Sequence, residues 1–331
     1  MKNLLTDIPG IRVGHADDAK LASGVTAVIF DEPAIAAVDV RGGGPGTREA
    51  AALDPTSTVE RIDGIALSGG SALGLDAAGG VQAWLREQGR GFRIREAVIP
   101  IVPGAICFDL LNGGDKNWGR FPPYLDLGYA AAAAAGTDFA LGSVGAGLGA
   151  TTATFKGGVG SASAKTAGGV AVAALAVVNA VGSVTLGDGP WFWAAPFEVG
   201  NEFGGRGLPA SFTPDMLTMR TKGGPAATPI ENTTLAVIVT DAVLTKPQAK
   251  RLAVIAQTGM ARAIYPVHAP LDGDLVFAAA TCAKPIDPLF GVTELGMVAA
   301  NTLSRAIARG VHAATALPFP GALPAWKDRF A

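Results

Sequence analysis

The sequence has few charges, few cysteines and few histidines for its length of 331 residues. Charged residues make up 16% of it, against a usual share of about 25%, and burial of surface in an oligomer would explain the deficit. Its net charge of −2 and its lack of a Lys/Arg cluster argue against nucleic acids as partners. Two cysteines without CxxC spacing, Cys107 and Cys282, predict reduced core residues instead of a disulfide or a metal-ligand pair.

A long apolar run and an N-terminal export signal are also missing. The first ten residues include Asp7 and Pro9 and lack the charged-then-apolar order of a signal peptide. The alanine run at residues 130–135 is far too short to cross a bilayer. We therefore expect a soluble, cytoplasmic protein, with residues 1–331 forming one large α/β domain.

Glycine is abundant, with 45 of 331 residues, and it separates short runs rich in Val and Ile that are typical of buried strands. The predicted strands are residues 24–30, 35–40, 64–67, 98–102, 170–178, 233–241 and 275–281. The predicted helices are residues 71–89, 246–263 and 293–309. Residues 112–123 predict an exposed loop, and residues 191–229 have almost no periodic pattern. The pattern resets at Thr233, as it would at the start of a separate polypeptide.

A threonine at the head of a predicted strand is the strongest candidate for chemistry. If the chain were cut between Asn232 and Thr233, Thr233 would supply a hydroxyl nucleophile and its own α-amine as base. An α-amine has an unperturbed pKa of about 7.7–8, so a useful fraction is neutral at physiological pH. The three histidines are not spaced as a catalytic triad. The alternative is that Thr233 and Thr234 simply begin a strand, because β-branched residues favour strands.

Two further features have a functional and an ordinary interpretation. Asn179 ends a predicted strand, where its amide could donate to the oxyanion formed by attack on a carbonyl, although such an asparagine is ordinarily a turn residue. The Gly-rich residues 41–46 lack the order of a phosphate-binding loop. They predict backbone packing beside a substrate pocket, and no nucleotide.

Several motifs follow one another along nearly the whole chain. They are TDIPGIRVGH (residues 6–15), VDVRGG (38–43), LSGGSA (67–72), GLDA (74–77) and KGGVG (156–160). This series resembles the self-processing N-terminal-nucleophile hydrolases of the DmpA-like type, which include aminopeptidases, β-aminopeptidases and nylon-oligomer endo-hydrolases. Such proteins cut themselves before a Ser or Thr that begins a strand ending in Thr-Asp. Here Thr240-Asp241 ends the strand that Thr233 begins.

The resemblance implies a fold, a maturation step and an activity. The fold is a four-layer αββα sandwich shared with ornithine acetyltransferase, similar to other N-terminal-nucleophile hydrolases but with a different chain order. Autocleavage gives an α subunit, residues 1–232, and a β subunit, residues 233–331, which assemble as a homotetramer. The activity is hydrolysis of small amides or oligoamides through an acyl-enzyme on Thr233, without a cofactor.

The resemblance also implies roles for a lysine and two acids. Lys156 resembles the active-site lysine of the family, whose positive field acts on the nucleophile; otherwise it is a solvated loop charge, and Lys165 is a less favoured substitute. Asp272 and Asp274 would hold the new α-amine and hydroxyl, although Asp-Gly-Asp spacing alone predicts a solvated turn equally well. No further acid or histidine lies at metal-ligand spacing. Some relatives have a tyrosine at the site, where this chain has Phe108.

Two other functions stay open from the sequence. One is acyl transfer to an amine, as in ornithine acetyltransferase, and the other is an uncleaved scaffold that keeps the fold without activity. The motifs do not distinguish among α-peptides, β-peptides, nylon oligomers and other amides as substrates, because the shape of the pocket decides among them.

Overall fold

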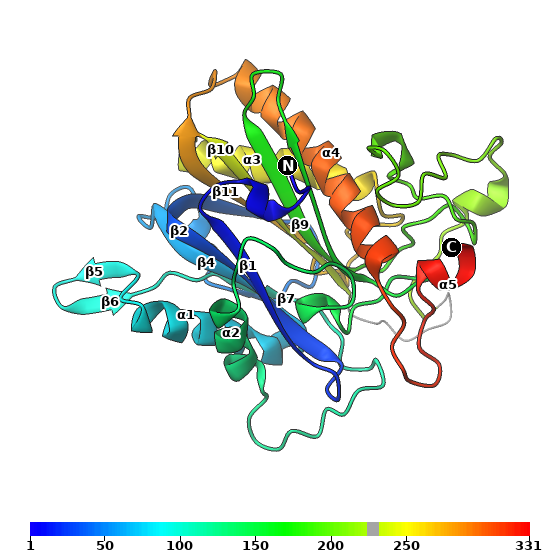
Figure 1. The fold of residues 1–331 in the computed structure, drawn as a ribbon, viewed down its shortest axis with the longest axis horizontal. Helices are drawn as coiled ribbons and strands as arrows, with labels where there is room; N and C mark the ends of the chain where they lie inside the picture. The colour runs from blue at the N-terminus through cyan, green and yellow to red at the C-terminus, as the bar shows by residue number, and fades with distance from the viewer. Residues whose placement is uncertain (224–231) are drawn as a thin grey trace.

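Residues 1–223 and 232–331 are described by the computed structural model, and nine of their strands form one hydrogen-bonded sheet (Figure 1). The order is β3-β7-β4-β2-β11-β10-β9-β8, and β1 pairs with β2. The strands are β1 (Ile11–Asp18), β2 (Ser23–Val40), β3 (Thr47–Arg48), β4 (Arg61–Ser68), β7 (Gly104–Ile106), β8 (Gly158–Lys165), β9 (Ala171–Asn179), β10 (Thr233–Ala242) and β11 (Leu275–Lys284). A separate hairpin, β5 (Phe92–Ile94) and β6 (Ala97–Ile99), projects from the body.

The long strand β2 divides this sheet into two layers. Its residues 25–29 pair with β1 and β4, whereas residues 35–40 pair with β11. The register is interrupted between these halves, where Asp31, Glu32 and Pro33 are exposed. Apolar side chains of both layers, such as Val28 and Val237, meet in one interlayer core. The two halves of β2 therefore belong to two stacked layers.

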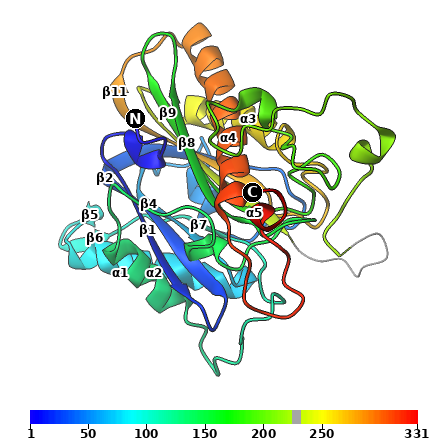
Figure 2. The ribbon, with the colours of Figure 1, turned by 45° about the vertical axis from the view of Figure 1, so that its right-hand side comes forward.

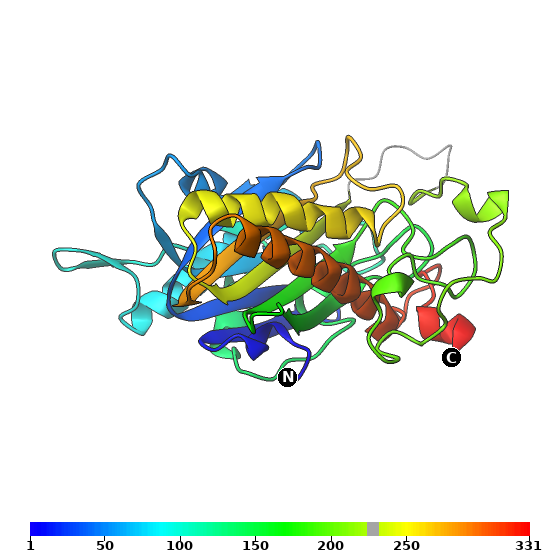
Figure 3. The same cartoon turned by 90° about the horizontal axis from the view of Figure 1, so that it is seen from above.

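Helices cover the outer faces of both layers. They are α1 (Ala77–Glu87), α2 (Tyr124–Ala133), α3 (Lys246–Ala261), α4 (Phe290–Ala313) and the short α5 (Trp326–Phe330). A second apolar core joins α3 and α4 to β8–β11, and Figure 3 shows these two helices lying over the strands. A third core joins α1 and α2 to β2 and β4. The predicted four-layer αββα sandwich is thus confirmed.

Strand β10 lies in the middle of its layer, and all ten of its residues are buried. It runs antiparallel to β9 and parallel to β11. Successive side chains of a strand alternate between faces, and Leu235 and Val237 enter the interlayer core whereas Ala236 packs toward the helices. Thr233 therefore faces the same side as the interlayer core, at its edge.

Several local predictions need correction. The strands expected at 24–30 and 35–40 are parts of one strand, β2. Residues 71–76 form a 3-10 helix, so α1 begins at Ala77. The strand expected at 98–102 is replaced by β6 and β7, because Pro100 and Pro103 lack the N–H that a strand ladder needs. Strands β1 and β8 and helix α2 were not predicted.

The segment from residue 180 to residue 223 has little regular structure, as predicted for its part from residue 191. It contains two 3-10 turns, η5 (Ala195–Phe197) and η6 (Pro214–Leu217). This segment forms a lobe beside the C-terminal α5 (Figure 2). Residues 224–229 of the predicted weak region lie outside the described residues.

Candidate active site

The strand register places Thr233 directly opposite Asn179. These residues are partners in the antiparallel β9–β10 pair, at the end of both strands, and both are almost fully buried. Directly opposite residues in such a pair have Cα atoms about 4.5–5.5 Å apart. The Thr233 hydroxyl donates a hydrogen bond to the carbonyl oxygen of Asn232. The predicted nucleophile, the predicted cleavage site and the predicted oxyanion donor are therefore adjacent.

The Asn179 side chain is held in one orientation. Its Oδ1 accepts from the Thr151 backbone N–H and from Lys222 Nζ, both at 3.0 Å. Its Nδ2 donates to the Phe108 carbonyl at 3.0 Å. Two donors at Oδ1 fix which end of the amide is oxygen. The NH₂ group has two hydrogens, so one of them is available to a further acceptor.

Asp272 and Asp274 lie in the loop before β11 and are not a solvated turn, because each is 1% exposed. Asp274 Oδ1 accepts from the Thr234 backbone N–H at 2.7 Å, which ties it to the residue after the predicted nucleophile. Its Oδ2 accepts from the His268 backbone N–H at 3.0 Å and lies 2.9 Å from His268 Nδ1. Asp274 is thus engaged on both oxygens.

Asp272 is less engaged than its neighbour. Its Oδ2 accepts from the Ala269 N–H at 2.9 Å, but its buried Oδ1 has no hydrogen-bond partner among the described residues. Burial and then the negative charge of Asp274 raise the pKa of Asp272. A carboxylate with an open, buried acceptor is suited to receive a proton donor, such as an ammonium group.

The Gly-rich loop at residues 41–46 is packed through its backbone, as predicted, and the structure places it against these two acids. The N–H groups of Arg41 and Gly42 donate to the Asp274 carbonyl at 2.9 and 3.1 Å, and that of Gly44 donates to the Asp272 carbonyl at 2.7 Å. A Cβ on Gly42 would lie 2.3 Å from the Asp272 carbonyl oxygen, so only glycine allows this contact. The loop therefore fixes the acids from the backbone.

Gly273, between the two acids, lies against the predicted nucleophile. A Cβ added there would be 2.4 Å from Thr233 Oγ1. Because real Cβ atoms do not approach so closely, a side chain at position 273 would displace the hydroxyl. The loop before β11 and the first residue of β10 are consequently in direct contact.

Lys156 is buried, but its ammonium contacts the backbone. Its Nζ donates to the carbonyls of Gly147, Ala150 and Gly157 at 2.9, 2.7 and 2.8 Å. Burial lowers the pKa of Lys156 to about 7. Among the hydrogen bonds of residues 1–223 and 232–331, none joins Lys156 to Thr233, so any effect on the nucleophile acts through its field. Lys165, the substitute, is exposed at the end of β8.

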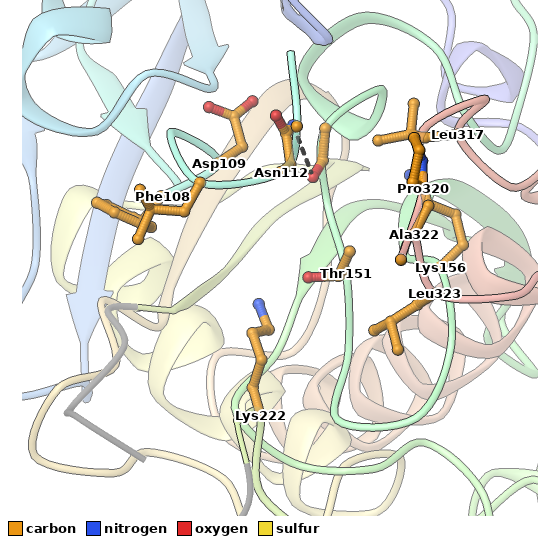
Figure 4. Close-up of a pocket in the computed structure, with 14 residues that line it drawn as sticks. Phe108, Asp109, Asn112, Thr151, Lys156, Lys222, Leu317, Pro320, Ala322 and Leu323 are labelled. Atoms are coloured by element: carbon orange, nitrogen blue, oxygen red, sulfur yellow. Dashed lines mark hydrogen bonds between the residues drawn. The ribbon is translucent and has the colours of Figure 1, made fainter.

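A cavity of about 320 Å³ lies beside the hydrogen-bond partners of Asn179 (Figure 4). Three of its lining residues, Phe108, Thr151 and Lys222, are also the hydrogen-bond partners of Asn179. The other lining residues are Asp109, Leu111, Asn112, Gly113, Gly149, Lys156, Leu317, Pro320, Gly321, Ala322 and Leu323. Burial lowers the pKa of Lys222 to about 8. The cavity is thus next to the residues that hold the candidate oxyanion donor, although Asn179 itself does not line it.

The described residues contain no group of three or more His, Cys, Asp or Glu side chains placed to hold a metal ion. Within the same residues, no helix is both long and apolar enough to span a bilayer. Cys107 is buried and free, as predicted, whereas the free Cys282 is only partly buried.

Two residues at this site were not predicted from the sequence. Lys222 lies in the irregular segment before the predicted cleavage point, and no periodicity there distinguishes it from a solvated lysine. His268 was set aside because the histidines lack triad spacing, yet it contacts Asp274. Its positive φ of 58° places it in a tight turn, and the sequence pattern does not predict this conformation.

Comparison with known proteins identifies the family. The model of Peptidase family S58 matches residues 3–321. The chain belongs to this family. An aminopeptidase of Mycobacterium tuberculosis, described as uncharacterized, is 44% identical to this S58 peptidase over 99% of the chain and 98% of its own length. A 6-aminohexanoate-oligomer endohydrolase of Kocuria sp. is 28% identical, over 85% of the chain and 75% of its own length.

Solved structures are similar over nearly the whole S58 peptidase. A β-aminopeptidase of Burkholderia sp. has a TM-score of 0.71 at 23% identity, covering 98% of this chain and 90% of that one. An L-aminopeptidase D-Ala-esterase/amidase of Ochrobactrum anthropi, a variant of the Ntn hydrolase fold, has a TM-score of 0.71 at 19% identity, covering 96% and 88%. These structures establish the fold. The family and its relatives identify the chain as a hydrolase of amide or peptide bonds.

Proposed function

We propose that this S58 peptidase cleaves itself between Asn232 and Thr233 and then uses Thr233 as an N-terminal nucleophile. The observation that carries the proposal is the pairing of Thr233 with Asn179 at one strand end, with the Thr233 hydroxyl on the Asn232 carbonyl. In the proposed roles, a nucleophile, a scissile carbonyl and an amide donor would lie together in one buried place. The supporting comparisons are relatives whose names describe aminopeptidases and an oligoamide hydrolase.

Self-cleavage begins with attack of Thr233 Oγ1 on the Asn232 carbonyl carbon. The C–N bond breaks, the hydroxyl proton passes to the departing nitrogen, and an ester joins Asn232 to Thr233. Water then hydrolyses this ester, which gives Asn232 a carboxylate and leaves Thr233 with a free amine and a free hydroxyl. The products are residues 1–232 and residues 233–331.

Hydrolysis of an external amide repeats the same chemistry with the new amine as base. The amine takes the hydroxyl proton, Oγ1 attacks the substrate carbonyl, and the leaving amine takes the proton as the C–N bond breaks. The free Nδ2–H of Asn179 donates to the oxyanion, a contribution of roughly 3–4 kcal/mol in a preorganised site. The open Oδ1 of Asp272 holds the ammonium form of Thr233. Water then attacks the acyl-enzyme and releases the acid.

A comparison of the two adjacent threonines tests the proposal. Thr233→Ala has no hydroxyl, so it should stay a single chain and hydrolyse no amide. Thr234→Val is the matched control, because the Thr234 hydroxyl has no hydrogen-bond partner among the described residues and valine has nearly the same shape. Gel electrophoresis and turnover of small peptide p-nitroanilides measure both effects. Cleavage or turnover in Thr233→Ala would remove Thr233 from the mechanism.

A further inference from the structure

Lys222 combines a fixed backbone with a side chain that points into the cavity. Its N–H donates to the Val181 carbonyl at 2.9 Å, which anchors it just beyond the end of β9. In Figure 4 its Nζ lies in the space between Phe108 and Thr151. There Nζ donates to Asn179 Oδ1 at 3.0 Å. The ammonium group is therefore both part of the cavity wall and next to the candidate oxyanion donor.

Asp109 and Lys156, the other charged residues that line the cavity, already have hydrogen-bond partners. Asp109 accepts from the Ser23 hydroxyl at 2.6 Å and from the Gly70 N–H at 2.8 Å. Lys156 places its three donors on three backbone carbonyls. Lys222 makes one hydrogen bond within the described residues, although an ammonium group has three N–H donors. Of the charged groups lining the described cavity, Lys222 has the most unused donor capacity.

We propose that Lys222 binds a carboxylate of the substrate, so that this S58 peptidase prefers small amides that carry one. This inference rests on the proposed function and names its substrate class. A partly buried ammonium attracts an anion because little water screens the pair, and such charge-assisted hydrogen bonds are the strong ones. The same positive charge repels a substrate ammonium from this end of the cavity.

The size and lining of the cavity limit what joins the carboxylate to the scissile amide. Leu111, Leu317 and Leu323 provide an apolar wall for a short methylene chain. Lys222 Nζ donates to the oxygen of the Asn179 side-chain amide, and Asn179 is the strand partner of Thr233. A carboxylate on Lys222 is therefore separated from the reacting carbonyl by only a few bonds. It belongs either to the acyl part of the substrate or to the leaving amine.

Two matched substrate pairs test the proposal and distinguish these positions. The acyl pair is glutaryl-p-nitroanilide and its neutral carboxamide, glutaramoyl-p-nitroanilide. The leaving-group pair is L-alanyl-glycine and L-alanyl-glycinamide. In at least one pair, kcat/KM of the wild type should favour the carboxylate, and Lys222→Met should reduce that preference by roughly 10- to 100-fold, as for the loss of one charge-assisted hydrogen bond. Lys222→Arg keeps the charge and should keep the preference.

Lys20→Met is the control, because Lys20 is an exposed lysine and its loss changes the net charge equally. It should leave both preferences unchanged. If Lys222→Met lowered kcat/KM equally for all four substrates, Lys222 would only orient Asn179, and the proposal would be overturned. The proposal would also be overturned if the wild type had the same kcat/KM for the carboxylate and the carboxamide in both pairs.

Binding of glutarate gives a readout that does not depend on hydrolysis. Calorimetry should detect glutarate binding to the wild type and at least tenfold weaker binding to Lys222→Met, if one charge-assisted hydrogen bond is lost. Absence of glutarate binding together with no carboxylate preference contradicts the role of Lys222. Glutarate binding by a protein that is never cleaved at Thr233 would instead contradict the proposed function and leave the Lys222 site standing.

Discussion

The β9–β10 strand pair and the irregular segment 180–223 bring residues to the same site in different ways. The strand pair is completely buried, and its register alone sets Thr233 opposite Asn179. The segment 180–223 has short 3-10 turns, and one backbone hydrogen bond anchors Lys222 near Val181. The groups that we propose to react thus lie on the buried strand layer, whereas the group that we assign to substrate choice lies on irregular chain. This division is common in enzymes, where loops vary around a fixed scaffold.

The largest effect within the strand pair is expected for Asn179. Asn179→Ala should lower kcat by roughly 10²- to 10³-fold, with a smaller change in KM, because it removes an oxyanion donor. Asn179→Asp keeps the acceptor for Thr151 and Lys222 but removes both N–H donors, so it should be impaired similarly. Steady-state kinetics on protein verified as cleaved measures both. A normal kcat in either variant would exclude the amide as the donor.

A smaller effect distinguishes the two acids of the loop before β11. The proposed mechanism requires the neutral Thr233 amine, so activity should fall at acid pH. The acid limb of the pH profile should lie near or below about 8, the ordinary pKa of an α-amine. Burial raises the pKa of Asp272, so its protonation adds to this loss. Asp272→Asn removes a negative charge that favours the ammonium form of the Thr233 amine. It should lower turnover and move the acid limb of the pH profile to lower pH by about one unit.

Asp274→Asn is the matched variant for this measurement. Asp274 is hydrogen-bonded to Thr234 and His268. Its replacement should therefore reduce cleavage or stability more than it shifts the acid limb of the pH profile. The measurement is a pH profile of kcat for both variants after complete cleavage has been checked. Two profiles identical to that of the wild type, with unchanged turnover, would mean that neither carboxylate acts on the amine.

The smallest expected effect concerns what the buried Lys156 and the partly buried Lys222 contribute to the stability of the protein. Lys156→Met removes the donor shared by three carbonyls and should lower the free energy of unfolding by about 1–3 kcal/mol. Lys222→Met removes one hydrogen bond and should lower it by about 1 kcal/mol or less. Denaturant unfolding in the Thr233→Ala background compares them as single chains. Equal losses would contradict the difference in hydrogen bonding between the two ammonium groups.

The sequence predicts the regular parts of the site and not the irregular ones. The sequence marks Thr233 and Asn179 as candidates because each bounds a continuous apolar run, and a buried strand has that signature. The contact of Asp274 with His268 depends on a turn with positive φ, and the contact of Lys222 with Asn179 depends on the path of unpatterned chain. Neither leaves a periodic signal. The continuity of β2 was also missed, because exposed Asp31 and Glu32 resemble a turn between two strands.

The most direct test of the central claim is N-terminal sequencing, with intact mass, of the fully matured wild-type protein. We predict two chains under denaturing conditions, one of them beginning Thr233-Thr234-Leu235. Their masses should sum to that of the full chain plus one water, because hydrolysis of the ester adds one. A single chain after prolonged incubation, or a break at any other bond, would contradict the assignment of Thr233 as the nucleophile.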